Sequence, residues 1–336
     1  MDPDRASVAY GRRAVPQLFE QLQQPETSGR LRALTSLCDL VHEPERFYQT
    51  ITGGFLEQLK VLLEDQDPSV RTKTCELLCL LTTRSLGRLF LISSSLLPPL
   101  WELLDDPSSS CRRNVYLVLT HLAELPAGAD VLHTLVPRLM LKLQEEEEEE
   151  EEEKVLLLSI LSSCSRVDPL PTLSLNGVHL MGQRLSHHSL DIRREACAVL
   201  LELSVPEDGK RQVCDQQLLP VLVSLLQDED VELQTNAAGV IMNVVILTSG
   251  KHLILGLKVL PILLELLSQE EEEEERRGRK ALILYCLQTL ASLAEAPSGR
   301  RVLLEQLPLL ERRSRDQDQD IQRVAQTTIR VVTWTP

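Results

Sequence analysis

The segment LLPVLVSLLQDEDVELQTNAAGVIMNVVILTSGK, residues 218–251, decides the fold of this chain. Its apolar residues recur at spacings of three and four, as they do on one face of a helix. Pro220 suits the first turn of that helix, because a proline there loses no helical hydrogen bond. The polar residues 227–230 interrupt the pattern, and a second helix is predicted after them, capped by acidic side chains.

The second helix of this segment is predicted to bury a face of small and aliphatic side chains. These residues are Ala237, Ala238, Val240, Ile241 and Val244. Gly250, which is followed by a lysine, is predicted to end the helix with a positive φ. A helix pair of this kind cannot cover its own apolar face, so we expect it to stack on similar pairs.

The same pattern recurs about every 41 residues. Its markers are Pro16, Glu57, Pro98, Pro137, His179, Pro220 and Pro261, at intervals of 41, 41, 39, 42, 41 and 41. A second set of markers is Gly87, Gly128, Gly209 and Gly250, at intervals of 41, 81 and 41. Helical self-similarity of this length predicts an all-α fold, an armadillo/HEAT-type α-solenoid. We expect a right-handed superhelix of about eight repeats.

The repeats account for nearly the whole chain, so residues 1–336 are predicted to form one solenoid domain. The predicted repeats are residues 14–53, 54–94, 95–134, 135–175, 176–216, 217–257, 258–304 and 305–336. Two runs of glutamate, 145–153 and 270–275, stand at turns between helices. Because like charges repel and stay hydrated, these runs are predicted to be acidic loop inserts. The alternative is an acidic landing site for a basic partner segment.

Composition argues against several classes of partner. The net charge of −15 disfavours binding to nucleic acid or to an anionic membrane, since both require clustered lysine and arginine. No apolar stretch is long enough to span a bilayer, and the first residues lack the apolar core of a secretory signal. Most of the eight cysteines lie among leucines, which predicts reduced packing residues in the cytoplasm.

The sequence contains no recognisable motif for catalysis or for cofactor binding. GxxxxGKS/T, GxGxxG, GxSxG and HExxH are all missing. Cys75 and Cys79 are four residues apart without a CxxC or a pair of histidines, so they are expected to pack in the core. His187 and His188 stand in a predicted turn near Asp191, where adjacent side chains rarely converge on a metal ion. We predict no enzyme, metal site, cofactor or small-molecule substrate.

A solenoid of this kind is expected to bind partners along its surface. In armadillo solenoids the last helix of each repeat lines a concave groove, and nuclear-import adaptors carry there a ladder of asparagines that clamps an extended peptide. Asn243 lies at such a position. Steps of one repeat from Asn243 reach Glu202, His121, Leu80 and Asp39. Because one rung alone is asparagine, and the two tryptophans Trp101 and Trp334 form no second ladder, a groove for basic import signals is not predicted.

Two sets of residues are the candidates for protein binding. The first, a predicted groove, consists of His121, Glu202, Asn236 and Asn243. The second is a ladder of arginines, Arg71, Arg112 and Arg193, at intervals of 41 and 81. Two interpretations of the arginines remain open. Each pairs with an acidic turn residue of a neighbouring repeat, or together they form a basic strip that binds an acidic peptide.

Three segments that the repeat does not require carry a resemblance to a known family. They are AYGRRA (9–14), CDLVHEPE (38–45) and WTP (334–336). Less specific segments follow in the same order, among them LLEDQDPSVRTKTCELL (62–78), HLAELPAGAD (121–130), SVPEDGKRQV (204–213) and LAEAPSGRRVLL (293–304). Over nearly its whole length the chain resembles the radial spoke head protein 14 family, armadillo-repeat proteins of the axonemal radial spoke. The two glutamate runs depart from the family's pattern, which has a short acidic patch near the first.

The resemblance implies a non-enzymatic structural subunit of the radial spoke, the complex that links outer doublet microtubules to the central pair in motile cilia and sperm flagella. It implies a location in the cytoplasm and cytoskeleton, in the axoneme of the cilium or flagellum. It also implies partners among other radial spoke and axonemal proteins, with no nucleic acid and no membrane. The alternative is a cytoplasmic armadillo adaptor or assembly factor that recruits client proteins outside the axoneme.

Overall fold

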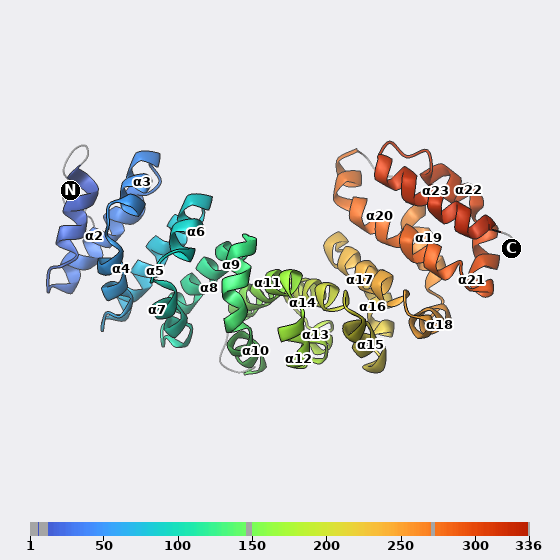
Figure 1. Cartoon of the computed structure of the whole chain (residues 1–336), viewed down its shortest axis with the longest axis horizontal. Helices are drawn as coiled ribbons and strands as arrows, with labels where there is room; N and C mark the ends of the chain where they lie inside the picture. The colour runs from blue at the N-terminus through green and yellow to red at the C-terminus, as the bar shows by residue number, and fades with distance from the viewer. Residues whose placement is uncertain (1–5, 7–12, 146–149, 270–272, 335–336) are drawn as a thin grey trace. The chain divides into compact units, whose positions relative to one another are not determined.

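The computed structural model describes residues 6, 13–145, 150–269 and 273–334 (Figure 1). These residues form α-helices joined by short turns, with no β-strand among them. The predicted all-α fold is therefore confirmed, and the chain is an α-solenoid. Within the same residues, no helix combines the length and the apolar character that a bilayer-spanning segment needs.

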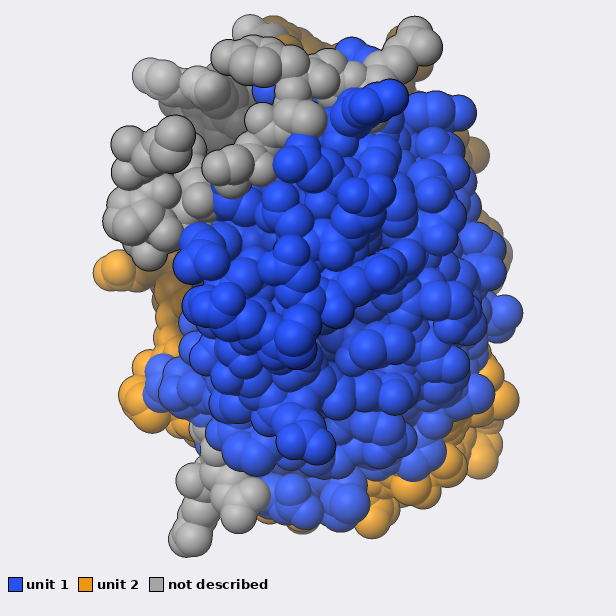
Figure 2. Space-filling model, turned by 90° about the vertical axis from the view of Figure 1, so that its left-hand side faces the viewer, with its two compact units in different colours: residues 1–167 blue, residues 168–336 orange. Residues whose placement is uncertain are grey.

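The chain divides into two compact units, residues 1–167 (unit 1) and residues 168–336 (unit 2), which are coloured separately in Figure 2. The division falls inside the predicted repeat 135–175, where the sequence predicts one continuous domain. Most of the other predicted repeat boundaries lie in turns between helices, and the boundary after residue 134 lies within a short 3-10 helix.

The helices are short and closely spaced. Those of unit 1 are α1 (Ala14–Gln21), α2 (Thr27–Leu40), α3 (Pro44–Thr52), α4 (Leu56–Leu63), α5 (Pro68–Thr82), α6 (Ser85–Ile92), α7 (Leu97–Glu102), η2 (Leu103–Asp105), α8 (Ser109–Ala123), α9 (Pro126–Leu132), η3 (His133–Leu135), α10 (Val136–Gln144) and α11 (Glu151–Val167). Those of unit 2 are α12 (Leu170–Ser174), α13 (Gly177–Arg184), α14 (Leu190–Leu203), α15 (Glu207–Asp215), α16 (Leu219–Leu225), α17 (Val231–Val244), α18 (Thr248–Gly256), α19 (Val259–Ser268), α20 (Glu273–Leu293), α21 (Pro297–Leu304), α22 (Leu307–Arg313) and α23 (Gln319–Thr333).

Three helices make one repeat, two short ones followed by a long one, as in α15, α16 and α17. The long helices of successive repeats lie side by side within each unit (Figure 1). In unit 1 the order is α2, α5, α8 and α11, and in unit 2 it is α14, α17, α20 and α23. Within each unit, neighbouring long helices thus bury their apolar faces against each other.

The segment 218–251 folds as its sequence predicts. Pro220 lies in the first turn of α16, and the Asp230 side chain caps α17 by accepting a hydrogen bond from the Leu233 amide at 2.8 Å. All five residues predicted to be buried on the second helix are at most 1% exposed. Tight aliphatic packing of this kind is the main stabilising term in a stacked-helix fold.

The recurring glycines have a different role from the predicted one. Gly250 lies inside α18 and not at a helix end, and a positive φ among the glycines is found at Gly54 alone in the described residues. A β-carbon at Gly250 would stand 2.3 Å from the carbonyl oxygen of Val244. At Gly87, Gly128 and Gly209 the corresponding distances, again to the residue six positions earlier, are 1.9, 2.0 and 1.7 Å. The predicted positive φ is wrong, and close approach to the preceding long helix explains the marker.

In several repeats the residue after the glycine is basic, and its side chain bonds a carbonyl group at the end of the preceding long helix. Arg88 Nε donates to the carbonyl oxygen of Thr82 at 2.8 Å, and Arg300 Nε donates to that of Ala294 at 3.0 Å. Lys210 reaches the carbonyl oxygen of Val205 in the same way. Carbonyl groups at a helix C-terminus lack partners within the helix, and a basic side chain satisfies them.

A second repeating feature is a left-handed backbone conformation at residues other than glycine. Asn176, Gln217 and Lys258 are 41 residues apart, and their φ angles are 58°, 56° and 55°. Each precedes the second helix of a repeat in unit 2. The left-handed conformation lets the chain reverse between two short helices, at a steric cost that glycine would avoid.

The glutamate runs are loops only in part. Glu151–Glu153 form the first turn of α11, and residues 273–275 begin α20. Residues 146–149 and 270–272 lie outside the described residues. The predicted loop inserts 145–153 and 270–275 therefore end in helix, because acidic residues suit the first turn and its partial positive charge.

The close approach at the glycines gives a test within one helix. We expect Gly250→Ala to lower the stability of the protein by about 1–3 kcal/mol, because the new methyl group would displace the Val244 carbonyl. Gly256→Ala in the same helix meets no atom within 4 Å and should leave the stability unchanged or slightly raised. Thermal unfolding followed by circular dichroism measures both. An equal loss in the two variants would contradict the close-approach explanation.

Candidate protein-binding surface

The candidate surface consists of the side chains that the long helices α2, α5, α8, α11, α14, α17, α20 and α23 turn away from the short helices; we call it the long-helix face. Each unit presents its own part of this face. The sequence-predicted residues all come from these helices. Three of them bond the preceding repeat, and the three arginines pair with the next one.

Two of the predicted groove residues bond the preceding long helix. Asn243 Nδ2 donates to Ser204 Oγ at 2.9 Å, and His121 Nδ1 lies 3.0 Å from Thr82 Oγ1. In both cases the partner is 39 residues earlier. Burial lowers the pKa of His121. Asn243 is 8% exposed, so its amide stabilises the stack more than it presents itself to a partner.

The other two predicted groove residues, Asn236 and Glu202, have different surroundings. Asn236 Nδ2 lies 3.5 Å from the carbonyl oxygen of Arg194, as Asn114 Nδ2 lies 3.3 Å from that of Thr72. Glu202 is half-buried on α14. His121, Glu202 and Asn243 thus lie at equivalent positions of their long helices, Asn236 lies two turns earlier on α17, and the binding role of all four stays a prediction.

The arginine ladder links successive repeats by ion pairs. Arg71 Nε lies 2.6 Å from Asp106 Oδ2, and Arg193 Nη2 lies 3.5 Å from Asp228 Oδ2. Arg112 Nη2 lies 3.2 Å from Glu153 Oε2. These are the contacts that the ion-pair interpretation predicts, with acidic residues of the next repeat.

The same arginines also bind turns of their own repeats. Arg71 Nη1 donates to the carbonyl oxygen of Asp65 at 2.8 Å, and Arg193 Nη1 donates to that of His187 at 3.0 Å. Sequence reasoning missed one member, Arg30, which pairs with Asp65 at 3.2 Å. An interval of 41 residues from Arg71 was the signal that could have found it.

Glu153 is an unexpected partner for Arg112. It belongs to the nine-glutamate run, yet its side chain is 1% exposed. The position is 41 residues after Arg112, so the fourth repeat has a carboxylate where its neighbours have an arginine. Burial of this carboxylate is compensated by the guanidinium group.

Glu195 is a further residue of the long-helix face that the sequence analysis did not single out. It stands 41 residues before Asn236, on α14. Its pKa is raised to about 6, chiefly by burial and then by the nearby Glu232 carboxylate, whereas Arg194 acts in the opposite direction. A carboxyl group with this pKa changes charge near neutral pH.

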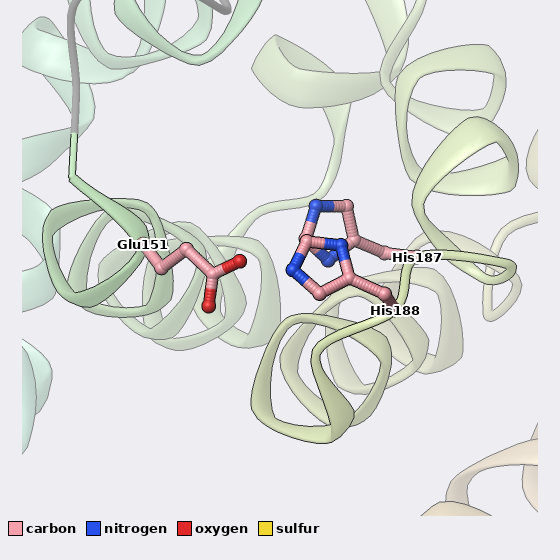
Figure 3. A group of neighbouring side chains, drawn as sticks. All are labelled: Glu151, His187 and His188. Atoms are coloured by element: carbon pink, nitrogen blue, oxygen red, sulfur yellow. The ribbon is translucent and has the colours of Figure 1, made fainter.

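His187, His188, Cys75 and Cys79 are the residues that the sequence analysis weighed for a metal or catalytic site. His187 and His188 lie in the loop between α13 and α14, with ring centroids 4.3 Å apart (Figure 3). The Ser189 amide donates to His187 Nδ1 at 3.1 Å. Burial raises the pKa of the Cys79 thiol to about 11, so it stays protonated at neutral pH. Cys75 Sγ is fully buried and lies 3.9 Å from Cys111 Sγ in the neighbouring repeat, which is a packing contact.

Comparison with known proteins agrees with the fold. Residues 30–176 match the family model of the non-SMC mitotic condensation complex subunit 1, and residues 206–245 match the Armadillo/beta-catenin-like repeat. The crystal structure of an engineered protein from a structural genomics consortium has a TM-score of 0.77 and 16% sequence identity, covering 96% of this chain and 89% of that chain. Neither family model describes an enzyme. The matches support armadillo-type repeats that bind proteins.

The arginine ladder gives a stability test. Arg71→Ala would leave Asp106, whose side chain is 2% exposed, buried without its cation, and we expect a loss of about 3–5 kcal/mol. The control is Arg211→Ala, which breaks a pair whose side chains are 65% and 64% exposed and should cost less than about 1 kcal/mol. Chemical denaturation measures the difference. Similar losses in both variants would show that burial does not govern these ion pairs.

Glu195 gives a pH test. Its pKa is raised from 4.5 to about 6 on folding, so ionisation costs stability as the pH rises through this range and the cost is constant above it. Allowing for partial exposure, Glu195→Gln should stabilise the protein by about 1 kcal/mol at pH 7.5. The gain should vanish near pH 4.5, where the carboxyl group of the folded protein is protonated. Unfolding curves across this range would refute the assignment if the gain did not depend on pH.

Proposed function

We propose that this protein is a non-enzymatic scaffold subunit of the radial spoke, in the axoneme of motile cilia and sperm flagella. The observation that carries the proposal is the set of segments that a helical repeat does not require, AYGRRA, CDLVHEPE and the terminal WTP. They stand at both ends of the chain, in the order found in the radial spoke head protein 14 family. Its partners would be other radial spoke and axonemal proteins.

The α-solenoid fold supports a scaffold role on physical grounds. Its repeats expose a long succession of equivalent side chains, and ordinary stable protein interfaces bury about 1,200–2,000 Å². A chain of about eight stacked repeats offers that area more than once. The ion pairs and carbonyl contacts between repeats hold these surfaces in register, so several partners could be held at once.

The comparisons support the same class of role at a coarser level. One matching family is, by its description, a subunit of the mitotic condensation complex, and the other is an armadillo-type repeat. Both are consistent with a protein that works by holding other proteins. The radial spoke itself rests on the sequence resemblance alone.

The second candidate function is that of a cytoplasmic adaptor or assembly factor. It stays open because few sequence motifs favour any one partner. The two roles differ in location. An axonemal subunit stays with demembranated axonemes through detergent extraction and salt washing. An assembly factor is found in the cell body before ciliation and is missing from purified axonemes.

Localisation is the direct test of this proposal. We expect a tagged chain in ciliated cells to remain on salt-washed axonemes and to co-purify with radial spoke proteins. Immunoblotting of axonemal and soluble fractions gives the answer. Recovery in the soluble fraction alone would replace the spoke assignment with the adaptor or assembly role.

A single charge reversal tests whether the long-helix face makes the contact. Glu202→Lys should reduce co-purification with spoke proteins several-fold, because like charges at an interface weaken association. The control is Glu207→Lys on α15, which is outside the long-helix face and 64% exposed. Circular dichroism confirms that both variants keep their helices. Equal co-purification in the two variants would exclude Glu202 from the interface.

A further inference from the structure

A groove of about 820 Å³ crosses the long helices α2, α5 and α8 of unit 1. Its lining includes the hydroxyl groups of Ser28, Ser69 and Ser110, which are 41 residues apart from one to the next. It also includes Arg32 and Lys73, again 41 residues apart. Among the residues that the structure describes, no carboxylate lines the groove, although the chain contains 50 acidic residues.

Arg32 and Lys73 stand at a position of the long helix whose side chain has a structural role in other repeats. The equivalent residues of other repeats are Asn114 and Asn236, whose amides approach carbonyl oxygens of the preceding long helix. Arg32 forms no ion pair within the part of the chain that the structure describes. Arg32 therefore places a charged side chain in the groove, at a position where other repeats use an asparagine to approach the preceding long helix.

Three carboxylates contact residues that line the groove. Glu26 accepts a hydrogen bond from Ser28 Oγ at 2.5 Å, and Asp67 accepts one from the Ser69 amide at 2.8 Å. Glu76 lies 2.7 Å from Lys73 Nζ on the same helix. That last pair is partly exposed and therefore weak, so a carboxylate of a ligand can replace it.

The repeat sets the spacing that a ligand must match. Packed helices stand about 8–10 Å apart, so Arg32 and Lys73 begin from helices separated by about that distance. A peptide in the polyproline II conformation has three residues per turn and a rise of about 3.1 Å per residue. Side chains three residues apart then lie on one side of the peptide and about 9 Å from each other.

We propose that this groove binds an extended acidic peptide in which two Asp or Glu residues are three positions apart. One carboxylate meets Arg32 and the other meets Lys73, while the serine hydroxyls and Thr72 bond the peptide backbone. The inference rests on the proposed scaffold function, since it names the chemistry of one partner segment. A protein segment suits the groove better than nucleic acid, because the net charge of the chain is −15.

Fluorescence anisotropy at low ionic strength with the purified full chain tests the proposal. The probe is a fluorescein-labelled peptide, Gly-Ser-Glu-Pro-Ser-Glu-Ser-Gly, and its isomer Gly-Glu-Ser-Pro-Ser-Glu-Ser-Gly has the two glutamates four apart. We expect the first peptide to bind at least about threefold more tightly than the isomer, and addition of salt to weaken it.

Matched variants locate the site. Arg32→Gln with Lys73→Gln should weaken the first peptide by about tenfold, which corresponds to two ion pairs of up to about 1 kcal/mol each. Arg211→Gln with Arg323→Gln removes two exposed cations outside the groove and should have little effect. Circular dichroism establishes that both double variants remain folded.

Three results would overturn the proposal: equal binding of the two peptides, equal binding by the two double variants, or tighter binding of oligolysine or of a single-stranded RNA oligonucleotide at this groove. Absence of the protein from axonemes would reject the radial spoke role and leave the peptide result standing, because the peptide assay uses the purified chain alone.

Discussion

The fold depends on how closely a short helix can approach the end of the long helix before it. At Gly209 the backbone comes so near to the Leu203 carbonyl that a β-carbon would stand 1.7 Å from its oxygen. The same contact recurs after α5, α8, α17 and α20, where Gly87, Gly128, Gly250 and Gly299 approach the carbonyl group six residues earlier. It brings the first short helix of the next repeat against the end of the long helix, from which the aliphatic packing and the ion pairs between long helices follow. At these turns a residue without a side chain meets the constraint, because a β-carbon would collide with the carbonyl group.

Much of the fold could be predicted, because its determinants are local and repeated. Proline at a helix start and apolar spacing of three and four predict the helices, and an interval of about 41 residues predicts the stack. The left-handed residues Gln217 and Lys258 could not be predicted, since packing of the helices on either side imposes their φ angles and no glycine marks them. The division after residue 167 also could not be predicted, because the repeat pattern continues across it.

The candidate site was less predictable, because spacing identifies equivalent positions but not what each side chain touches. The interval from Asn243 correctly reached residues on long helices, yet the bond from Asn243 to Ser204 depends on the distance between two helices. The partner of Arg112 could not be chosen from nine consecutive glutamates, which are identical in sequence. Glu195 was missed because its raised pKa comes from burial and from Glu232 on another helix.

The place of Glu153 has a consequence for how this protein tolerates change in its own gene. Runs of one amino acid readily gain or lose copies, and an altered count inside a folded repeat would ordinarily shift everything that follows. Here the bonded carboxylate is the third residue of α11, in its first turn. In a chain with one glutamate more or fewer, we expect a different copy of the same residue to meet Arg112. The ion pair and the register of α11 would then be kept, because consecutive glutamates are interchangeable at this position.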